Sequence, residues 1–98
     1  MLESQFQSKL KKLLKKRFPD CVVIKNDANC IQGIPDLSVF YKNKWAMLEC
    51  KKSALAHHQP NQDYYVERFD KMSFSRFVYP ENLDDVLDEL DIFFRGGD

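Results

Sequence analysis

Two apolar runs separated by three polar residues constrain the fold of this chain more than any other feature of its sequence. Residues 36–41 (DLSVFY) and 45–51 (WAMLECK) have the length and the β-branched and aromatic content of strands. Lys42-Asn43-Lys44 joins them, and asparagine tolerates the positive φ that a tight turn needs. These residues predict an antiparallel hairpin over 36–51.

Apolar residues at helical spacing predict a first helix before this hairpin and a last helix near the C-terminal end. The first helix should end at Phe18-Pro19, because a residue before proline resists the helical conformation. The last helix should run over 83–94, with Gly96 just past its end. The apolar positions that carry the two patterns are Leu2, Phe6, Leu10, Leu13, Leu14, Leu83, Val86, Leu87, Leu90 and Phe94.

Shorter patterns complete the chain. Pro60 suits the first turn of a middle helix, which should run to about Lys71. The remaining predicted elements are a strand over 21–24, a loop over 25–34, a loop over 52–59 and a strand over 74–79. The resulting order, α-β-β-β-α-β-α, is that of an α/β or α+β fold in which one sheet is flanked by helices.

Length and composition predict a single domain over residues 1–98, because a second core would leave neither half enough buried surface. No apolar run approaches the roughly 20 residues that span a bilayer. The N-terminal segment also lacks the apolar block of a signal peptide. We therefore expect an intracellular, cytoplasmic protein without a membrane partner.

The three cysteines are an odd number without a CxxC pair, which favours reduced thiols that pack as small hydrophobic side chains. A zinc site from Cys30 or Cys50 with His57 and His58 is a weaker alternative, because the spacing matches no usual zinc pattern.

Charge is unevenly distributed although the net charge is zero. Residues 1–20 carry six basic and two acidic side chains, whereas residues 80–98 carry one basic and seven acidic. A phosphate backbone would be drawn to the basic part and repelled by the acidic end. Two solvated helix faces would produce the same pattern, so the asymmetry does not establish a nucleic-acid partner.

The predicted hairpin gathers three charged side chains. Asp36 lies seven residues before Asn43 and Glu49 lies six after it, so the two carboxylates should face each other across adjacent strands. Lys51 follows Glu49 by two residues and should therefore point to the same face of the sheet. The hairpin thus predicts two carboxylates and an ammonium group at one place.

Such a cluster suits a divalent cation, because two adjacent carboxylates repel each other unless a cation intervenes. Mg²⁺ prefers oxygen ligands and could polarise a phosphodiester, with Mn²⁺ as a substitute. Lys51 could then hold a water or hydroxide and offset the charge that grows on the phosphorane. The backbone carbonyl of Cys50 is a further candidate ligand. The alternative is an ordinary strand ion pair between Glu49 and Lys51, which contributes little when exposed.

Gly33-Ile34-Pro35-Asp36-Leu37 and Leu48-Glu49-Cys50-Lys51 resemble the motifs of the PD-(D/E)xK nuclease superfamily, in the form of its VRR-NUC branch, which includes small phage proteins. The similarity covers residue 3 to about residue 79. It implies a restriction-endonuclease-like αβββαβ core with one mixed sheet, followed here by a C-terminal helix. Pro60-Asn61-Gln62 also resembles the family's proline-x-glutamine. Cys50 departs from a position that is often β-branched.

By this resemblance, Asp36 and Glu49 are metal ligands and Lys51 is catalytic. Glu3 would assist a metal or its water, and Gln62 would reach the site from the middle helix. Each of these two residues has a structural alternative. Glu3 would be a carboxylate at the start of a helix, and Gln62 would be a buried amide bonded to backbone. Candidate phosphate contacts are Lys52, Lys25, His57, His58 and Arg68, each of which could equally be a solvent-facing polar residue.

These expectations together describe a magnesium-dependent DNA endonuclease. The resemblance implies a homodimer that acts on branched DNA such as Holliday junctions, in the host cytoplasm if the protein is phage-encoded. A nuclease for nicked, single-stranded or linear DNA would use the same residues. A nucleic-acid-binding module of the same fold that does not cut is the alternative from a different class.

Overall fold

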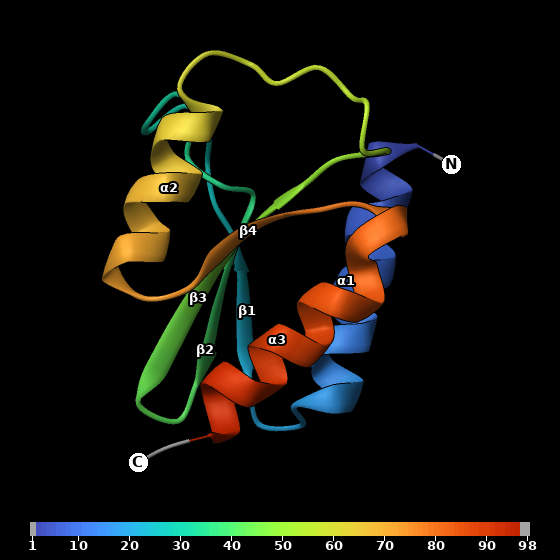
Figure 1. The fold of residues 1–98 in the computed structure, drawn as a ribbon, viewed down its shortest axis with the longest axis vertical. Coiled ribbons are helices and arrows are strands. Elements are labelled where there is room, and N and C mark those ends of the chain that lie inside the picture. Colours follow the sequence, from blue (N-terminus) through green and yellow to red (C-terminus); the bar gives the residue numbers. More distant parts are fainter. Residues whose placement is uncertain (1, 97–98) are drawn as a thin grey trace.

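A mixed four-stranded sheet separates one helix from two others (Figure 1). The computed structural model describes residues 2–96 and has the element order that the sequence predicts. The elements are α1 (Glu3–Arg17), β1 (Val22–Lys25), β2 (Leu37–Tyr41), β3 (Lys44–Cys50), α2 (Gln62–Met72), β4 (Ser75–Val78), the short 3₁₀ helix η1 (Pro80–Asn82) and α3 (Leu83–Arg95). The predicted α/β class, with a middle helix between the last two strands, is confirmed.

The strands lie in the order β1-β2-β3-β4. The first three pair antiparallel, and β3 pairs parallel with β4. A parallel neighbour requires a crossover connection, which α2 and its loops provide. Leu37 pairs with Leu48 across the hairpin, so the next residues outward, Asp36 and Glu49, are neighbours at the end of the two strands.

Two local expectations were wrong. The hairpin turn has its positive φ at Lys42 (56°), the first of its two central residues, and not at Asn43. The middle helix begins at Gln62 instead of Pro60, because the preceding Asn61 has a left-handed conformation with φ of 71°. Gln62 N–H closes this turn by donating to the carbonyl of Gln59 at 3.2 Å.

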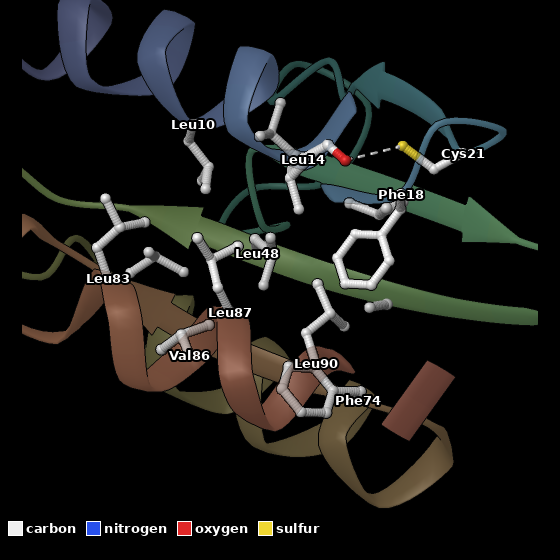
Figure 2. Close-up of a cluster of buried hydrophobic side chains, with 14 of the residues drawn as sticks. Leu10, Leu14, Phe18, Cys21, Leu48, Phe74, Leu83, Val86, Leu87 and Leu90 are labelled. Atoms are coloured by element: carbon white, nitrogen blue, oxygen red, sulfur yellow. Dashed lines mark hydrogen bonds between the residues drawn. The ribbon is translucent and has the colours of Figure 1, made fainter. Parts of the chain in front are cut away.

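The hydrophobic core lies between the sheet and the pair α1 and α3 (Figure 2). Alternation along β3 directs Leu48 and Cys50 into this core and leaves Glu49 on the opposite face, which α2 covers. The apolar end of α3 packs here as well, since the Phe94 ring meets Phe18 edge-on at 5.3 Å. Fully or almost fully buried members include Phe6, Leu10, Leu14, Phe18, Leu48 and Leu90.

Ion pairs join the two helices on this side. Arg17 of α1 contacts Asp88 at 2.6 Å and Asp91 at 3.1 Å, both on α3. The basic first helix and the acidic last helix therefore lie side by side, as Figure 1 also shows. Within residues 2–96, no helix is both long and apolar enough to cross a membrane.

Candidate metal centre

Three carboxylates meet at the end of the hairpin. Each of Glu3, Asp36 and Glu49 has a carboxylate oxygen within 4.8 Å of the other two. The register of β2 and β3 accounts for Asp36 and Glu49, as the sequence predicts. Glu3 arrives from the first turn of α1, which packs on the other face of the sheet. In the part of the chain that the structure describes, this is the one group of three or more acidic, histidine or cysteine side chains close enough to share a metal.

Asp36 is held by the backbone of the neighbouring strand. Its Oδ2 accepts a hydrogen bond from the N–H of Cys50 at 2.9 Å. The N–H and C=O of one strand residue point toward the same neighbouring strand. The Cys50 carbonyl is therefore directed to the side of β3 on which Asp36 lies, in keeping with its candidacy as a further oxygen ligand.

Glu49 and Lys51 are both buried, with 1% and 4% of their surfaces exposed. This excludes the solvent-exposed strand ion pair that the sequence left open. Their direct contact is long, 3.9 Å from Nζ to Oε2. Charged groups that are removed from water need close partners, and a third side chain supplies them.

Gln62 bridges the two charges. Its Nε2 donates to Glu49 Oε2 at 3.0 Å, and its Oε1 accepts from Lys51 Nζ at 2.6 Å. The same Oε1 also accepts from the N–H of Gln59 at 2.8 Å. Gln62 therefore contacts both Glu49 and Lys51, and it also makes the backbone hydrogen bond of the structural alternative. Lys51 Nζ is further held by the carbonyl of His57 at 3.1 Å.

Negative charge exceeds positive charge in this cluster, because three carboxylates face one ammonium group. Burial of Glu49, followed by the charge of Asp36, raises the pKa of this carboxyl to about 8, although Lys51 acts in the opposite direction. Glu49 Oε1 is buried and has no hydrogen-bond partner among residues 2–96. A buried acceptor without a donor is costly, so this oxygen marks a place that a proton or a cation would occupy favourably.

Asn26 is a supporting residue that the sequence analysis missed. Its backbone N–H donates to the carbonyl of Asp36 at 2.7 Å, and its side-chain Nδ2 donates to the carbonyl of Pro35 at 2.9 Å. Its Oδ1 accepts from Ser38 Oγ at 2.9 Å. Asn26 therefore fixes the chain immediately before and at Asp36. The partners lie 9–12 residues away in sequence, so no local pattern marks the residue.

Gly33 fixes the same loop against α2. It has a φ of +92°, and a Cβ built there would lie 2.6 Å from Asn61 Cβ. Only glycine permits both this conformation and this approach. Because Asn61 directly precedes Gln62, the contact sets the loop that carries Asp36 against the helix that carries Gln62.

The five candidate phosphate contacts are not gathered on one element. Lys52 and His57 are exposed on the loop after Lys51, Lys25 ends β1, and Arg68 is exposed on α2. His58 Nδ1 lies 2.7 Å from Asp63 Oδ1, and its ring stacks on Phe77 with centroids 4.2 Å apart. The His58 ring is thus engaged within the protein.

Two of the three cysteines are buried, as expected for thiols that pack as small hydrophobic side chains. Cys21 and Cys50 are buried, and burial raises the pKa of both thiols. Cys30 is exposed, contrary to the expectation that all three pack inside. Its loop lies at the surface around residues 27–32.

Comparisons with protein-family models, with curated proteins and with solved structures found no match for this chain.

Replacing the buried carboxyl should change the pH dependence of stability. Because folding raises the pKa of Glu49 from 4.5 to about 8, the metal-free protein loses stability as the pH rises between these values. We expect Glu49→Gln to match the wild type near pH 4.5 and to be more stable by about 2–4 kcal/mol at pH 9. Urea unfolding in EDTA at several pH values measures this.

The matched control is Glu67→Gln, since Glu67 is exposed on α2 and pairs with Lys71. Its difference from the wild type should stay within about 0.5 kcal/mol at every pH. A Glu49→Gln difference that does not grow with pH would contradict the expectation.

Proposed function

We propose that this protein is a metal-dependent nuclease whose site contains Asp36, Glu49, Lys51, Glu3 and Gln62. The observation that carries the proposal is the group of three carboxylates within 4.8 Å beside a buried lysine. A purely structural cluster would be expected to satisfy its buried acceptors, whereas Glu49 Oε1 has no partner in the part of the chain that the structure describes.

The residues fit a hard divalent cation. Carboxylate oxygens from three separate elements converge, and the Cys50 carbonyl is directed to the same side. Mg²⁺ takes such oxygen ligands and retains waters, and Mn²⁺ accepts the same donors. Asp36 and Glu49 would hold the ion, and Glu3, which is more exposed, would contact it or one of its waters.

A bound cation would supply polarisation of a phosphodiester oxygen and a lower pKa for an attacking water. The chain's own residues would do the rest. Lys51 would orient that water and offset negative charge on the oxygens of the phosphorane, since its ammonium is held by Gln62 and the His57 carbonyl. Gln62 would keep Lys51 and Glu49 at a fixed separation.

Sequence motifs support the family assignment within this proposal. The Gly33–Leu37 and Leu48–Lys51 segments resemble PD-(D/E)xK motifs of the VRR-NUC form, and the αβββαβ order agrees with that core. Fold likeness alone would not argue for activity. The argument rests on the same motif residues forming the carboxylate and lysine cluster.

We propose DNA as the substrate, with preference for branched forms such as four-way junctions. One domain of this size has little surface for reading bases, so shape and backbone contacts suit it better. Nicked, single-stranded and linear DNA are alternative substrates for the same site. Lys52, Lys25, His57 and Arg68 remain candidate phosphate contacts, whereas His58 is less suited because of its internal contacts.

A homodimer would place two such sites on opposite strands of one junction. The expected native mass is then twice the 11.6 kDa of one chain. Light scattering on the purified protein measures it, and a single-chain mass at micromolar concentration would contradict the dimer.

Cleavage of a labelled four-way junction with Mg²⁺ tests the site. We expect Asp36→Asn and Lys51→Gln each to lower the rate about 100-fold or more, because each removes a group that acts at the reacting phosphate. Asp27→Asn and Lys42→Gln are charge-matched controls at exposed positions outside the proposed site, and each should leave the rate unchanged. Equal cleavage by the wild type and Asp36→Asn would reject the site.

The same assay separates the alternatives. A panel of linear, nicked, flapped and single-stranded DNA identifies the preferred substrate. A protein that binds junctions but cuts none of these with Mg²⁺ or Mn²⁺ is the binding module instead.

The Asn26→Ala variant tests whether Asn26 positions Asp36. Loss of the side-chain bonds to Pro35 and Ser38 should loosen this ligand and weaken Mn²⁺ binding about tenfold. Asn29→Ala, an exposed asparagine in the same loop, should change the affinity less than about twofold. Calorimetric titration measures both, and equal affinities for the two variants would refute a positioning role for Asn26.

A further inference from the structure

Four lysines cluster on the outer side of the first helix. Lys11, Lys12, Lys15 and Lys16, here called the lysine quartet, lie in the C-terminal half of α1. Lys12, Lys15 and Lys16 are exposed and Lys11 is half-buried. Residues three and four apart on a helix are neighbours, so the quartet forms a single patch of positive charge.

The quartet has no ion-pair partner among residues 2–96, unlike the two arginines at the boundary between α1 and α3. Arg17 and Arg95 both pair with acidic residues of α3. Lys16 borders a surface hollow with Asp84 but makes no ion pair with it. Like charges at i and i+4 destabilise a helix, and Lys11–Lys15 and Lys12–Lys16 are two such pairs. An anionic partner would remove this repulsion.

The patch is aligned with the candidate metal centre. Glu3, Gln7, Lys11 and Lys15 follow one another at intervals of four, so they form one ridge along α1. The rise of an α-helix places Lys11 about 12 Å and Lys15 about 18 Å from Glu3 along the axis. A polyanionic chain bound at the metal centre would reach these lysines within a few of its own monomer units.

We infer that the lysine quartet is a docking surface for the phosphate backbone of the substrate, several nucleotides from the bond at the metal centre. This inference rests on the proposed function, and it places DNA contact on a helix outside the five candidates considered above. The acidic α3 pairs with Arg17 on one flank of α1, which Lys16 also borders, and its negative charge would keep the DNA toward Lys11 and Lys15.

An anionic membrane would be the other polyanionic partner for such a patch. A helix that binds a lipid interface needs an apolar face to insert. The large apolar residues Phe6, Leu10 and Leu14 of α1 are fully buried in the core. The hollow beside the quartet is lined by Ser4, Gln5, Ser8, Lys9, Lys12 and Leu13, and its one apolar member, Leu13, is half-buried. Nucleic acid therefore fits this surface better.

The test measures binding of a fluorescein-labelled DNA duplex over 50–200 mM KCl, in the Asp36→Asn background so that the DNA stays intact. Each lost phosphate contact lowers the slope of log K against log salt by about 0.9. We expect Lys11→Gln/Lys15→Gln to lower the slope by about 2 and to weaken binding about tenfold or more at the lowest salt. Glutamine has a helix propensity close to that of lysine, so the helix should persist.

The matched control removes the same charge elsewhere. Lys42→Gln/Lys71→Gln changes exposed lysines in the hairpin turn and on α2, and should alter the slope by less than about 0.5. Equal slopes for the two double variants would overturn the inference. Wild-type binding to phosphatidylserine vesicles that Lys11→Gln/Lys15→Gln abolishes, without a change in the DNA slope, would overturn it in favour of a lipid surface.

The outcome is separable from that of the nuclease proposal. If the wild type cleaves DNA and the slopes agree, the docking surface fails and the active site stands. If the wild type never cleaves but the slope falls by about 2, the quartet binds DNA and the catalytic proposal fails.

Discussion

The pairing of Leu37 with Leu48 across β2 and β3 decides where every charged group of the site lies. It buries both leucines between the sheet and the helices α1 and α3, and alternation then sends Glu49 and Lys51 to the α2 face. A slip of one residue would exchange the two faces and bury carboxylates in the apolar core. The hydrophobic core therefore enforces the register, and the register brings Asp36 to Glu49. Stability and site geometry depend on the same contact.

A few residues carry the energetically unfavourable features of this arrangement. Glu49 and Lys51 are buried, and the Oε1 atom of Glu49 lacks a hydrogen-bond partner within the described chain. Gly33 and Asn61 adopt left-handed conformations nearby. Strained conformations and unsatisfied polar groups tend to cluster at the functional sites of proteins. Here the hydrogen bonds of Gln62 and Asn26 hold the unfavourable groups in place, so the surrounding fold can tolerate a cluster that would otherwise relax.

Charge is unevenly distributed over the surface of the protein. Net charge is zero, yet the basic and acidic segments form separate helices that lie side by side. Arginines at their boundary join the two helices, while the lysines farther around α1 stay free of ion pairs within the described chain. Ion pairs at the interface of α1 and α3 stabilise the packing of the two helices. The unpaired lysines of α1 leave a positive electrostatic potential outside this interface.

The sequence by itself determined the order of elements, the hairpin and the proximity of Asp36 to Glu49, because strand alternation and turn length are local properties. The resemblance of its motifs predicted that Gln62 would approach from the middle helix. Only the tertiary structure decided that Gln62 contacts both Glu49 and Lys51, that Glu3 joins them, that Asn26 holds Asp36, and that the pKa of Glu49 is raised. These features require segments far apart in the chain to pack together, and burial exists only after they have done so.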